Sequence, residues 1–299
     1  MLSRRLISAA IIVSFMVTVV WADYHLPGWG LPLPGLLLMI VTWAAQMIAT
    51  GELIEMWKRD GRSVSFFVAL VGVTVMFVGA SLPIIAPKPL GDCSLGLFGG
   101  VFLGLFGALC VASVYEIVQY DPANKAFDRM AHHLFAIVYM AMLAGGVAFH
   151  RRLFEDNGFG LCSAIAVIAT VKMSDATAYG FGKAFGKHKL SPKISSGKTI
   201  EGALGAFVGG IAGAAIVFYL VAPQVAGNVH ERSWLWIIGY GITLTIAGMI
   251  GDLAESIIKR DAHCKDSSVW VPGLGGILDI LDSLIFAVPA SCIYWIMTT

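Results

Sequence analysis

The chain has 299 residues, of which 58% are hydrophobic and 13% are charged, and its formal net charge is +1. Soluble globular domains carry about 25% charged residues, so the composition excludes an ordinary soluble protein. A near-neutral chain has no overall field to attract nucleic acid, and we expect no nucleic-acid partner. The five cysteines are scattered without a C-x-x-C pair, which suggests neither a zinc site nor a disulfide framework.

Apolar runs of about 18 or more residues recur along the chain, as is typical of transmembrane helices. We predict an all-α, polytopic integral membrane protein with about nine transmembrane helices. Their approximate ranges are 6–22, 35–56, 64–86, 95–118, 131–149, 159–181, 203–222, 234–256 and 277–297. The first run resembles a signal peptide, but it is long enough to span and more spans follow, so we interpret it as an uncleaved helix. Small residues, as in "GALGAFVGGIAGAA", permit close contact between helices.

The basic residues predict the orientation, because lysine and arginine favour cytoplasmic loops. With a cytoplasmic N-terminus, fifteen of the 20 lysines and arginines fall in cytoplasmic segments and four on the opposite side. We therefore predict a cytoplasmic N-terminus. The two richest polar links, 182–202 and 257–276, then face the cytoplasm together. In the second span, Glu52 and Glu55 fall near the cytoplasmic end and are expected to be solvated beside Lys58 and Arg59.

One charged group surrounds the link between the last two spans. Asp252, Glu255, Ser256 and Lys259 have the spacing of one helix stripe. Asp279 and Asp282 share one face at the start of the last span, after the glycine-rich break "PGLGG" at 272–276. Charges at membrane depth are costly and mark functional sites.

The residue types in this group indicate phosphate chemistry. Clustered carboxylates repel one another, and a hard cation such as Mg²⁺ relieves that repulsion. Lys259, Arg260 and Lys265 can hold phosphate oxygens. Carboxylates for a metal together with cations for phosphates favour phosphoryl or nucleotidyl transfer. The alternative is a set of salt bridges on a solvated face beside the membrane.

A second charged group covers 172–202. Lys172 and Asp175 lie one turn apart, and a plain internal ion pair is the alternative to a functional role. The stretch "SSGKTIEG" is no phosphate loop of the usual kind, because Pro192 stands where glycine is needed and no strand is expected before it. Gly197, Lys198 and Thr199 still precede a helix and offer an anion cradle. A role in attracting anionic lipid is the alternative for these lysines.

Both groups together resemble the CDP-diacylglycerol synthases, or phosphatidate cytidylyltransferases. That family's signature is Ser-x-x-Lys-Arg, four residues, Lys-Asp, then Pro-Gly-His-Gly-Gly and Asp-Arg-x-Asp. This chain reads "SIIKRDAHCKD" and "PGLGGILDILDS". The matching positions are Ser256, Lys259, Arg260, Lys265, Asp266, Pro272, Gly273, Gly275, Gly276, Asp279 and Asp282. The stretch "SDATAYGFGKAFGKHKLSPKISSGKTIEG" and "GDLAES" at 251–256 are similar to the family as well, so the resemblance is strong over about 170–285.

Two positions depart from the family pattern. Leu274 stands in place of histidine, and Ile280 stands in place of arginine. The absence of the histidine removes a proton relay, and the absence of the arginine removes a positive charge. These changes would fit altered kinetics, a different lipid or an inactive paralogue. The acids and the Lys/Arg cluster are retained, and we favour an active enzyme.

The resemblance implies transfer of a cytidylyl group from CTP to phosphatidic acid, with Mg²⁺ and a monovalent cation such as K⁺ as cofactors. It implies a metal site at Asp252, Asp279 and Asp282. The implied catalytic residues are Asp175, Lys198, Ser256, Lys259, Arg260, Lys265 and Asp266, and the implied substrate-binding residues are Thr199, Glu201, Glu255, Gly275 and Gly276. We expect the site within the helices of 159–299, preceded by a helical region over 1–158.

Three alternatives stay open. The chain could act with CTP on another membrane lipid, such as an isoprenoid ether lipid or a polyprenol. It could be an ion-coupled transporter, although no inverted repeat is evident and the acids gather at one membrane side. It could also be an inactive relative that serves as a membrane scaffold. We expect a bacterial inner-membrane location with the site facing the cytoplasm, and a homodimer is compatible with this class.

Overall fold

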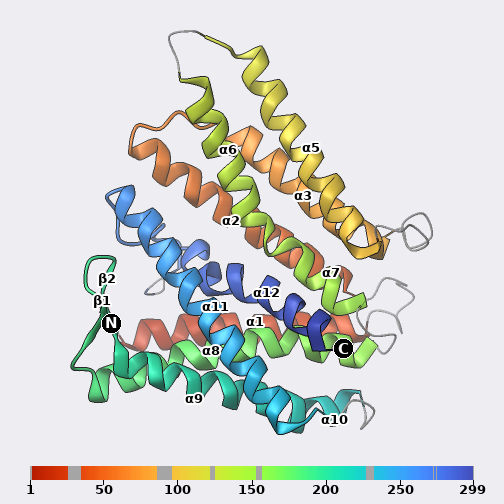
Figure 1. Ribbon diagram of the computed structural model, residues 1–299, viewed down its shortest axis with the longest axis vertical. Coiled ribbons are helices and arrows are strands. Elements are labelled where there is room, and N and C mark those ends of the chain that lie inside the picture. Colours follow the sequence, from red (N-terminus) through yellow and green to blue (C-terminus); the bar gives the residue numbers. More distant parts are fainter. Residues whose placement is uncertain are drawn as a thin grey trace. The chain divides into compact units, whose positions relative to one another are not determined.

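The computed structural model describes residues 2–25, 35–85, 96–121, 125–152, 157–226, 232–271, 273 and 275–298. Within these residues the chain is almost entirely helical, with one small β-hairpin (Figure 1). This confirms the predicted all-α class. Pro272 and Leu274 of the glycine-rich break lie outside the described residues.

The chain forms two compact units, each made of two segments of the sequence. The first unit comprises Met1–Phe149 and Asp261–Leu281, and the second comprises His150–Arg260 and Asp282–Thr299. The predicted division into 1–158 and 159–299 concerns the order of the spans and stays a prediction.

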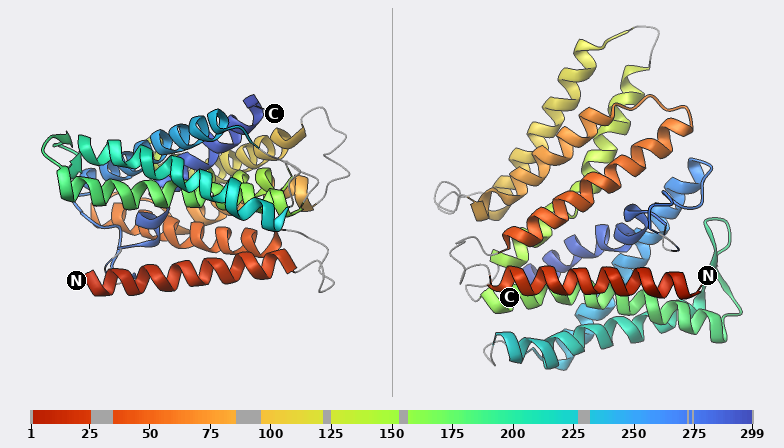
Figure 2. Two further views of the ribbon diagram at one scale, coloured as in Figure 1. Left: turned by 90° about the horizontal axis from the view of Figure 1, so that it is seen from below. Right: turned by 180° about the vertical axis from the view of Figure 1, so that it is seen from behind.

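The first unit is a bundle of apolar helices. Its helices are α1 (Leu2–His25), α2 (Leu36–Arg59), α3 (Phe66–Ile85), α5 (Gly96–Val118), α6 (Ala126–Ala141) and most of α7 (Ala144–Arg152). Helices α3 and α5 run side by side (Figures 1 and 2). A Cβ atom on Gly79 would lie 2.6 Å from the Cα atom of Gly104, so glycine permits the two backbones to touch.

The predicted single span over 131–149 is wrong in detail, because the chain breaks there into α6 and α7. Residues 142 and 143 form a turn between the two helices. Gly145 and Gly146 lie in the first turn of α7, one residue beyond this turn, and glycine is a weak helix former. The local sequence therefore lowers the cost of a break inside an otherwise apolar run.

The second unit contains the other helices and the hairpin. Its elements are α8 (Asn157–Phe185), β1 (Lys189–Ser191), β2 (Ser195–Thr199), α9 (Ile200–Ile216), η2 (Val217–Val221), α10 (Ala222–Val225), α11 (Trp234–Asp261) and α12 (Ile277–Thr298), whose first turn belongs to the first unit. Helices α8 and α9 lie side by side (Figure 1). A Cβ atom on Gly213 would lie 2.7 Å from the carbonyl oxygen of Ala169, which confirms the role predicted for the small residues.

The expectation that no strand precedes "SSGKTIEG" is wrong. Strands β1 and β2 pair antiparallel, with Lys189 opposite Thr199 and Ser191 opposite Ser195. The turn between them contains Pro192, and a Ser-Pro step favours turn initiation. Two strands this short carry too few residues for a readable alternation, so the periodicity of the sequence did not indicate them.

Six helices of the described residues are long and apolar enough to cross a membrane. They are Leu36–Arg59, Gly99–Val118, Gly158–Phe185, Ile200–Val225, Trp234–Asp261 and Ile277–Thr298. Two shorter apolar helices cover Ala10–His25 and Phe66–Leu82. The protein is thus a polytopic membrane protein, while the number nine and the cytoplasmic N-terminus stay predictions.

Candidate active site

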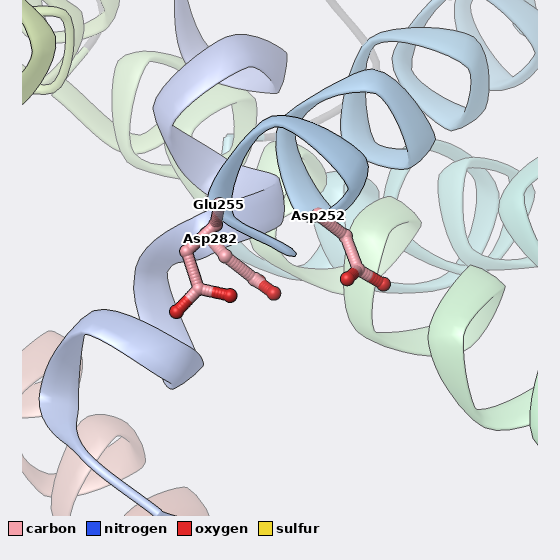
Figure 3. A group of neighbouring side chains, drawn as sticks. All are labelled: Asp252, Glu255 and Asp282. Carbon is pink, nitrogen blue, oxygen red and sulfur yellow. The ribbon is translucent and has the colours of Figure 1, made fainter. Parts of the chain in front are cut away.

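Three carboxylates of the second unit gather where α11 and α12 meet. Asp252 and Glu255 come from α11 and Asp282 comes from α12 (Figure 3). One carboxylate oxygen of each lies within 4.8 Å of the others. Glu255 is fully buried, and Asp282 is 9% exposed. Three oxygen donors in one place match the ligand type that a hard divalent cation prefers.

Local helix geometry and one glycine bring the three acids together. Asp252 and Glu255 are three residues apart, so they share a face of α11. Gly251 lies against α12, where an added Cβ atom would be 2.4 Å from the carbonyl oxygen of Asp282. Only a residue without a side chain permits this approach, because a Cβ atom there would overlap the α12 backbone. The close approach of the helices therefore sets the geometry of the acidic cluster, by which we mean Asp252, Glu255 and Asp282.

Two lysines offset part of the negative charge of the acidic cluster. Lys198 Nζ lies 2.7 Å from Asp252 Oδ2. Lys259 pairs with Glu255 one turn earlier on the same helix. Buried charges are tolerated when they are paired, so these contacts explain how the acids stand so close. The same ammonium groups are the type that neutralises phosphate oxygens.

The β-hairpin positions Lys198 beside α11. Thr199 follows it as the N-cap of α9, and its hydroxyl accepts a hydrogen bond from Gly202 N at 3.1 Å. Arg260 Nε donates to the carbonyl oxygen of Ile194 at 3.3 Å, which joins the end of α11 to the hairpin turn. The hairpin is thereby held at both ends.

Glu201 has a structural contact set in the first turn of α9. It accepts hydrogen bonds from the backbone N–H groups of Lys187 (3.1 Å) and His188 (3.2 Å). His188 Nδ1 lies 2.7 Å from the same carboxylate. These contacts hold the connection between α8 and β1. The predicted role of Glu201 in substrate binding stays a prediction.

Asp175 and Ser256 are two further residues of the predicted site. Lys172 Nζ and Asp175 Oδ2 lie 3.4 Å apart on α8, and both side chains are partly exposed. The ion pair named as the alternative is therefore present, and the catalytic role of Asp175 stays a prediction. Ser256 is buried in α11.

The other predicted residues belong to the first unit. Lys265 and Asp266 are exposed. Gly275 has a φ angle of +94°, a conformation that glycine adopts without strain. Asp279 Oδ2 accepts hydrogen bonds from Gly276 N (2.7 Å), Ser267 N (3.0 Å) and Ser267 Oγ (2.8 Å). Its predicted metal role stays a prediction. Ile280 is half-buried in the first turn of α12.

The expectation that Glu52 is solvated is wrong. Its side chain is buried, with the residue 5% exposed, and it contacts residues 215 to 226 positions later in the chain. No local pattern indicates such distant partners. Glu55 is 61% exposed and pairs with Arg59, as expected.

These features define a polytopic membrane protein with an acidic cluster and two paired lysines where α11 and α12 meet. The family model described as "Cytidylyltransferase family" matches residues 3–298, and the chain belongs to that family. It is 28% identical over 296 residues to a phosphatidate cytidylyltransferase of Thermotoga maritima, which covers 98% of this chain and 95% of the relative. The phosphatidate cytidylyltransferase of Staphylococcus saprophyticus is 32% identical over 258 residues, covering 85% and 88%. That of Chlamydia muridarum is 42% identical over 130 residues, covering 44% and 42%. The resemblance found in the sequence is thus confirmed.

Proposed function

We propose that this protein transfers a cytidylyl group from CTP to phosphatidic acid and forms CDP-diacylglycerol and pyrophosphate. The observation that carries the proposal is the acidic cluster with its paired lysines, Lys198 and Lys259, in a membrane protein of the cytidylyltransferase family. The names of the relatives supply the lipid acceptor.

The reaction needs no protein nucleophile. A phosphate oxygen of the lipid attacks the α-phosphorus of CTP and forms the new P–O bond. The bond between the α-phosphorus and the bridging oxygen to the β-phosphate breaks, and pyrophosphate leaves with that electron pair. The protein contributes position and charge neutralisation, which dominate catalysis of such transfers.

Asp252, Glu255 and Asp282 fit a divalent cation, because their oxygens converge and the two paired lysines offset only two of the three negative charges. We propose Mg²⁺ at this place and K⁺ as a second cation, and the metal role of Asp279 stays a prediction. A bound Mg²⁺ stabilises negative charge on the triphosphate and on the leaving pyrophosphate. The family resemblance implied Asp252, Asp279 and Asp282 as metal ligands and Glu255 as a substrate-binding residue. The proposed metal site differs because it includes Glu255.

The lysines and arginines act on the phosphates. In the proposed reaction Lys198 and Lys259 would bind phosphate oxygens of the substrates, for which their ammonium groups are suited. Arg260 and the exposed Lys265 add positive charge for the triphosphate and the lipid phosphate. Asp175, Thr199 and Glu201 are assigned to the nucleotide side.

The proposed location follows from the substrates. CTP is water-soluble and cytoplasmic, whereas phosphatidic acid is embedded in the membrane. We therefore propose an enzyme of the bacterial inner membrane with its N-terminus and its site on the cytoplasmic side. A homodimer and the absence of a nucleic-acid partner belong to the same proposal.

The alternatives differ in what they require. A transporter is disfavoured by membership of the cytidylyltransferase family. Another lipid acceptor and an inactive relative both remain compatible with the replacements at Leu274 and Ile280. The first predicts product with a different lipid, and the second predicts CTP binding without product.

The test supplies purified protein in detergent with Mg²⁺, CTP labelled in the cytosine ring, and one lipid at a time. The lipids are phosphatidic acid, diacylglycerol and a polyprenyl phosphate. We expect labelled lipid with phosphatidic acid, its loss in Asp282→Asn, and normal product in Asp128→Asn, whose aspartate is exposed on α6. Labelled product only with another lipid would replace the proposed acceptor. Bound CTP without any product would support the inactive relative.

A further inference from the structure

Glu52 on α2 is a buried carboxylate that none of the roles above uses. We propose that Glu52 is a positioning residue for the transfer reaction. It fixes the first turn of α12 and the described loop residues over 265–271 and 275–276, and these segments carry acids and a lysine of the predicted site. The inference rests on the proposed function, because it assigns Glu52 a role in that reaction.

The Glu52 carboxylate is held by four hydrogen bonds within the first unit. Oε1 accepts from Ser268 Oγ at 2.6 Å and from Ile277 N at 3.1 Å. Oε2 accepts from Ser267 Oγ at 3.1 Å and from Leu278 N at 2.8 Å. A buried carboxylate is costly unless it is hydrogen-bonded, and this set satisfies both oxygens. Two of the donors are loop hydroxyls and two are backbone groups of α12.

The hydrogen bonds from Ile277 N and Leu278 N mean that Glu52 on α2 caps the N-terminus of α12. The first N–H groups of a helix lack intrahelical partners and usually bind an N-cap side chain. Gly276 precedes α12 and has no side chain, so Glu52 takes that role for Ile277 and Leu278. Asp279 accepts from Gly276 N, as the third helical residue does in a capping box. The negative charge of Glu52 also interacts favourably with the positive end of the helix dipole.

The carboxylates of Glu52 and Asp279 also explain why glycine occupies positions 275 and 276. A Cβ atom on Gly276 would lie 2.3 Å from Glu52 Oε2 and 2.0 Å from Ser267 Oγ. A Cβ atom on Gly275 would lie 2.4 Å from Asp279 Oδ2. Any side chain at either position would overlap these oxygens. Glycine at 275 and 276 therefore leaves room for the carboxylates that fix the start of α12.

The fixed segment matters for the reaction because of what it carries. Lys265 and Asp266 stand on the loop, and Asp279 and Asp282 lie in the first two turns of α12. Reactions that depend on positioning and charge lose rate when charged groups shift. Outer groups that orient the ligands of a metal site typically contribute about 10- to 100-fold to metal affinity or activity, and Asp279 and Asp282 are predicted ligands of this kind. Glu52 acts through these residues and is not assigned any contact with substrate.

The main variant is Glu52→Gln, which keeps the size of the side chain. Its amide NH₂ would face a hydroxyl and a backbone N–H that need an acceptor, so half of the contact set is lost. We expect kcat to fall by about 10- to 100-fold, with a smaller change in the KM for CTP. We also expect faster amide hydrogen exchange in peptides over 265–283, without faster exchange elsewhere.

Two further variants separate positioning from a general loss of structure. Ser268→Ala removes the 2.6 Å donor alone and should lower kcat by about 2- to 10-fold, the worth of one hydrogen bond. It should also increase exchange in the same peptides. Glu55→Gln is the matched control, because Glu55 stands on the same helix and is solvent-exposed. It should change neither rate nor exchange.

The inference is overturned if Glu52→Gln leaves kcat or the exchange of 265–283 unchanged. It is also overturned if activity falls together with faster exchange throughout the protein, because Glu52 would then support the fold in general. Absence of lipid product from the wild-type protein contradicts the proposed function instead. The exchange comparison then still decides whether Glu52 orders this segment.

Discussion

Replacing Gly251 by alanine should separate α11 from α12 and disturb the acidic cluster. The added Cβ atom would lie 2.4 Å from the carbonyl oxygen of Asp282 and 3.3 Å from Phe286 Cδ2. Comfortable contacts between such atoms begin near 3.5 Å, so one helix must move by about 1 Å. Overpacking of this kind costs about 1–3 kcal/mol. The better helix propensity of alanine offsets about 0.5–1 kcal/mol of that cost.

We therefore expect Gly251→Ala to lower the free energy of unfolding by about 1–2 kcal/mol. The effect on rate should be larger, because a displacement of about 1 Å at a reacting centre can cost about 100-fold. Gly248→Ala is the matched control one turn earlier on α11. Its Cβ atom would meet Ser283 Cβ at 3.6 Å, which is an ordinary contact. This control should keep its activity and unfold at the same or a higher temperature.

The assay combines thermal unfolding in detergent, followed by tryptophan fluorescence, with initial rates of lipid cytidylylation. Equal stability and equal rates for Gly251→Ala and Gly248→Ala would refute the reasoning. In that case the approach of α11 to α12 would not set the geometry of the site.

Two other predictions concern the charged residues themselves. Lys198→Met should lower kcat by about 100-fold through loss of a preorganised cation. Lys193→Met, in the exposed hairpin turn, should leave kcat unchanged. Equal initial rates for the two variants would contradict the role of Lys198. Glu255→Gln should raise the Mg²⁺ concentration for half-maximal activity by about tenfold or more, because fewer charged ligands weaken cation binding. A Mg²⁺ titration that matches the wild type would remove Glu255 from the metal site.

Much of the fold could be predicted, because apolar runs of membrane length are strong signals. The last span, predicted as 277–297, is the helix Ile277–Thr298. The break in 131–149 was not predicted, since hydrophobicity alone does not distinguish one helix from two joined by a turn. Two glycines next to the break were the available signal.

The site could be predicted in part for the same physical reason. The stripe that joins Asp252 to Glu255 follows from helix periodicity, and it is present. Asp282 joins these two acids because Gly251 packs against the backbone of α12, and residue spacing in the sequence does not show this contact. The contacts of Glu52 join α2 to a loop more than 200 residues later, and only the tertiary fold shows them. Because Glu52 is close to Lys58 and Arg59 in the sequence, a solvated side chain was expected, whereas the side chain is buried.

The most direct test of the central claim is to follow two labels of CTP with phosphatidic acid as acceptor. One CTP sample carries label in the cytosine ring and the other carries it in the γ-phosphate. The account predicts that the ring label enters the lipid, while the γ-label appears in pyrophosphate in equal amount. Transfer of the γ-label to lipid would show a kinase reaction instead, and that result would contradict attack at the α-phosphorus.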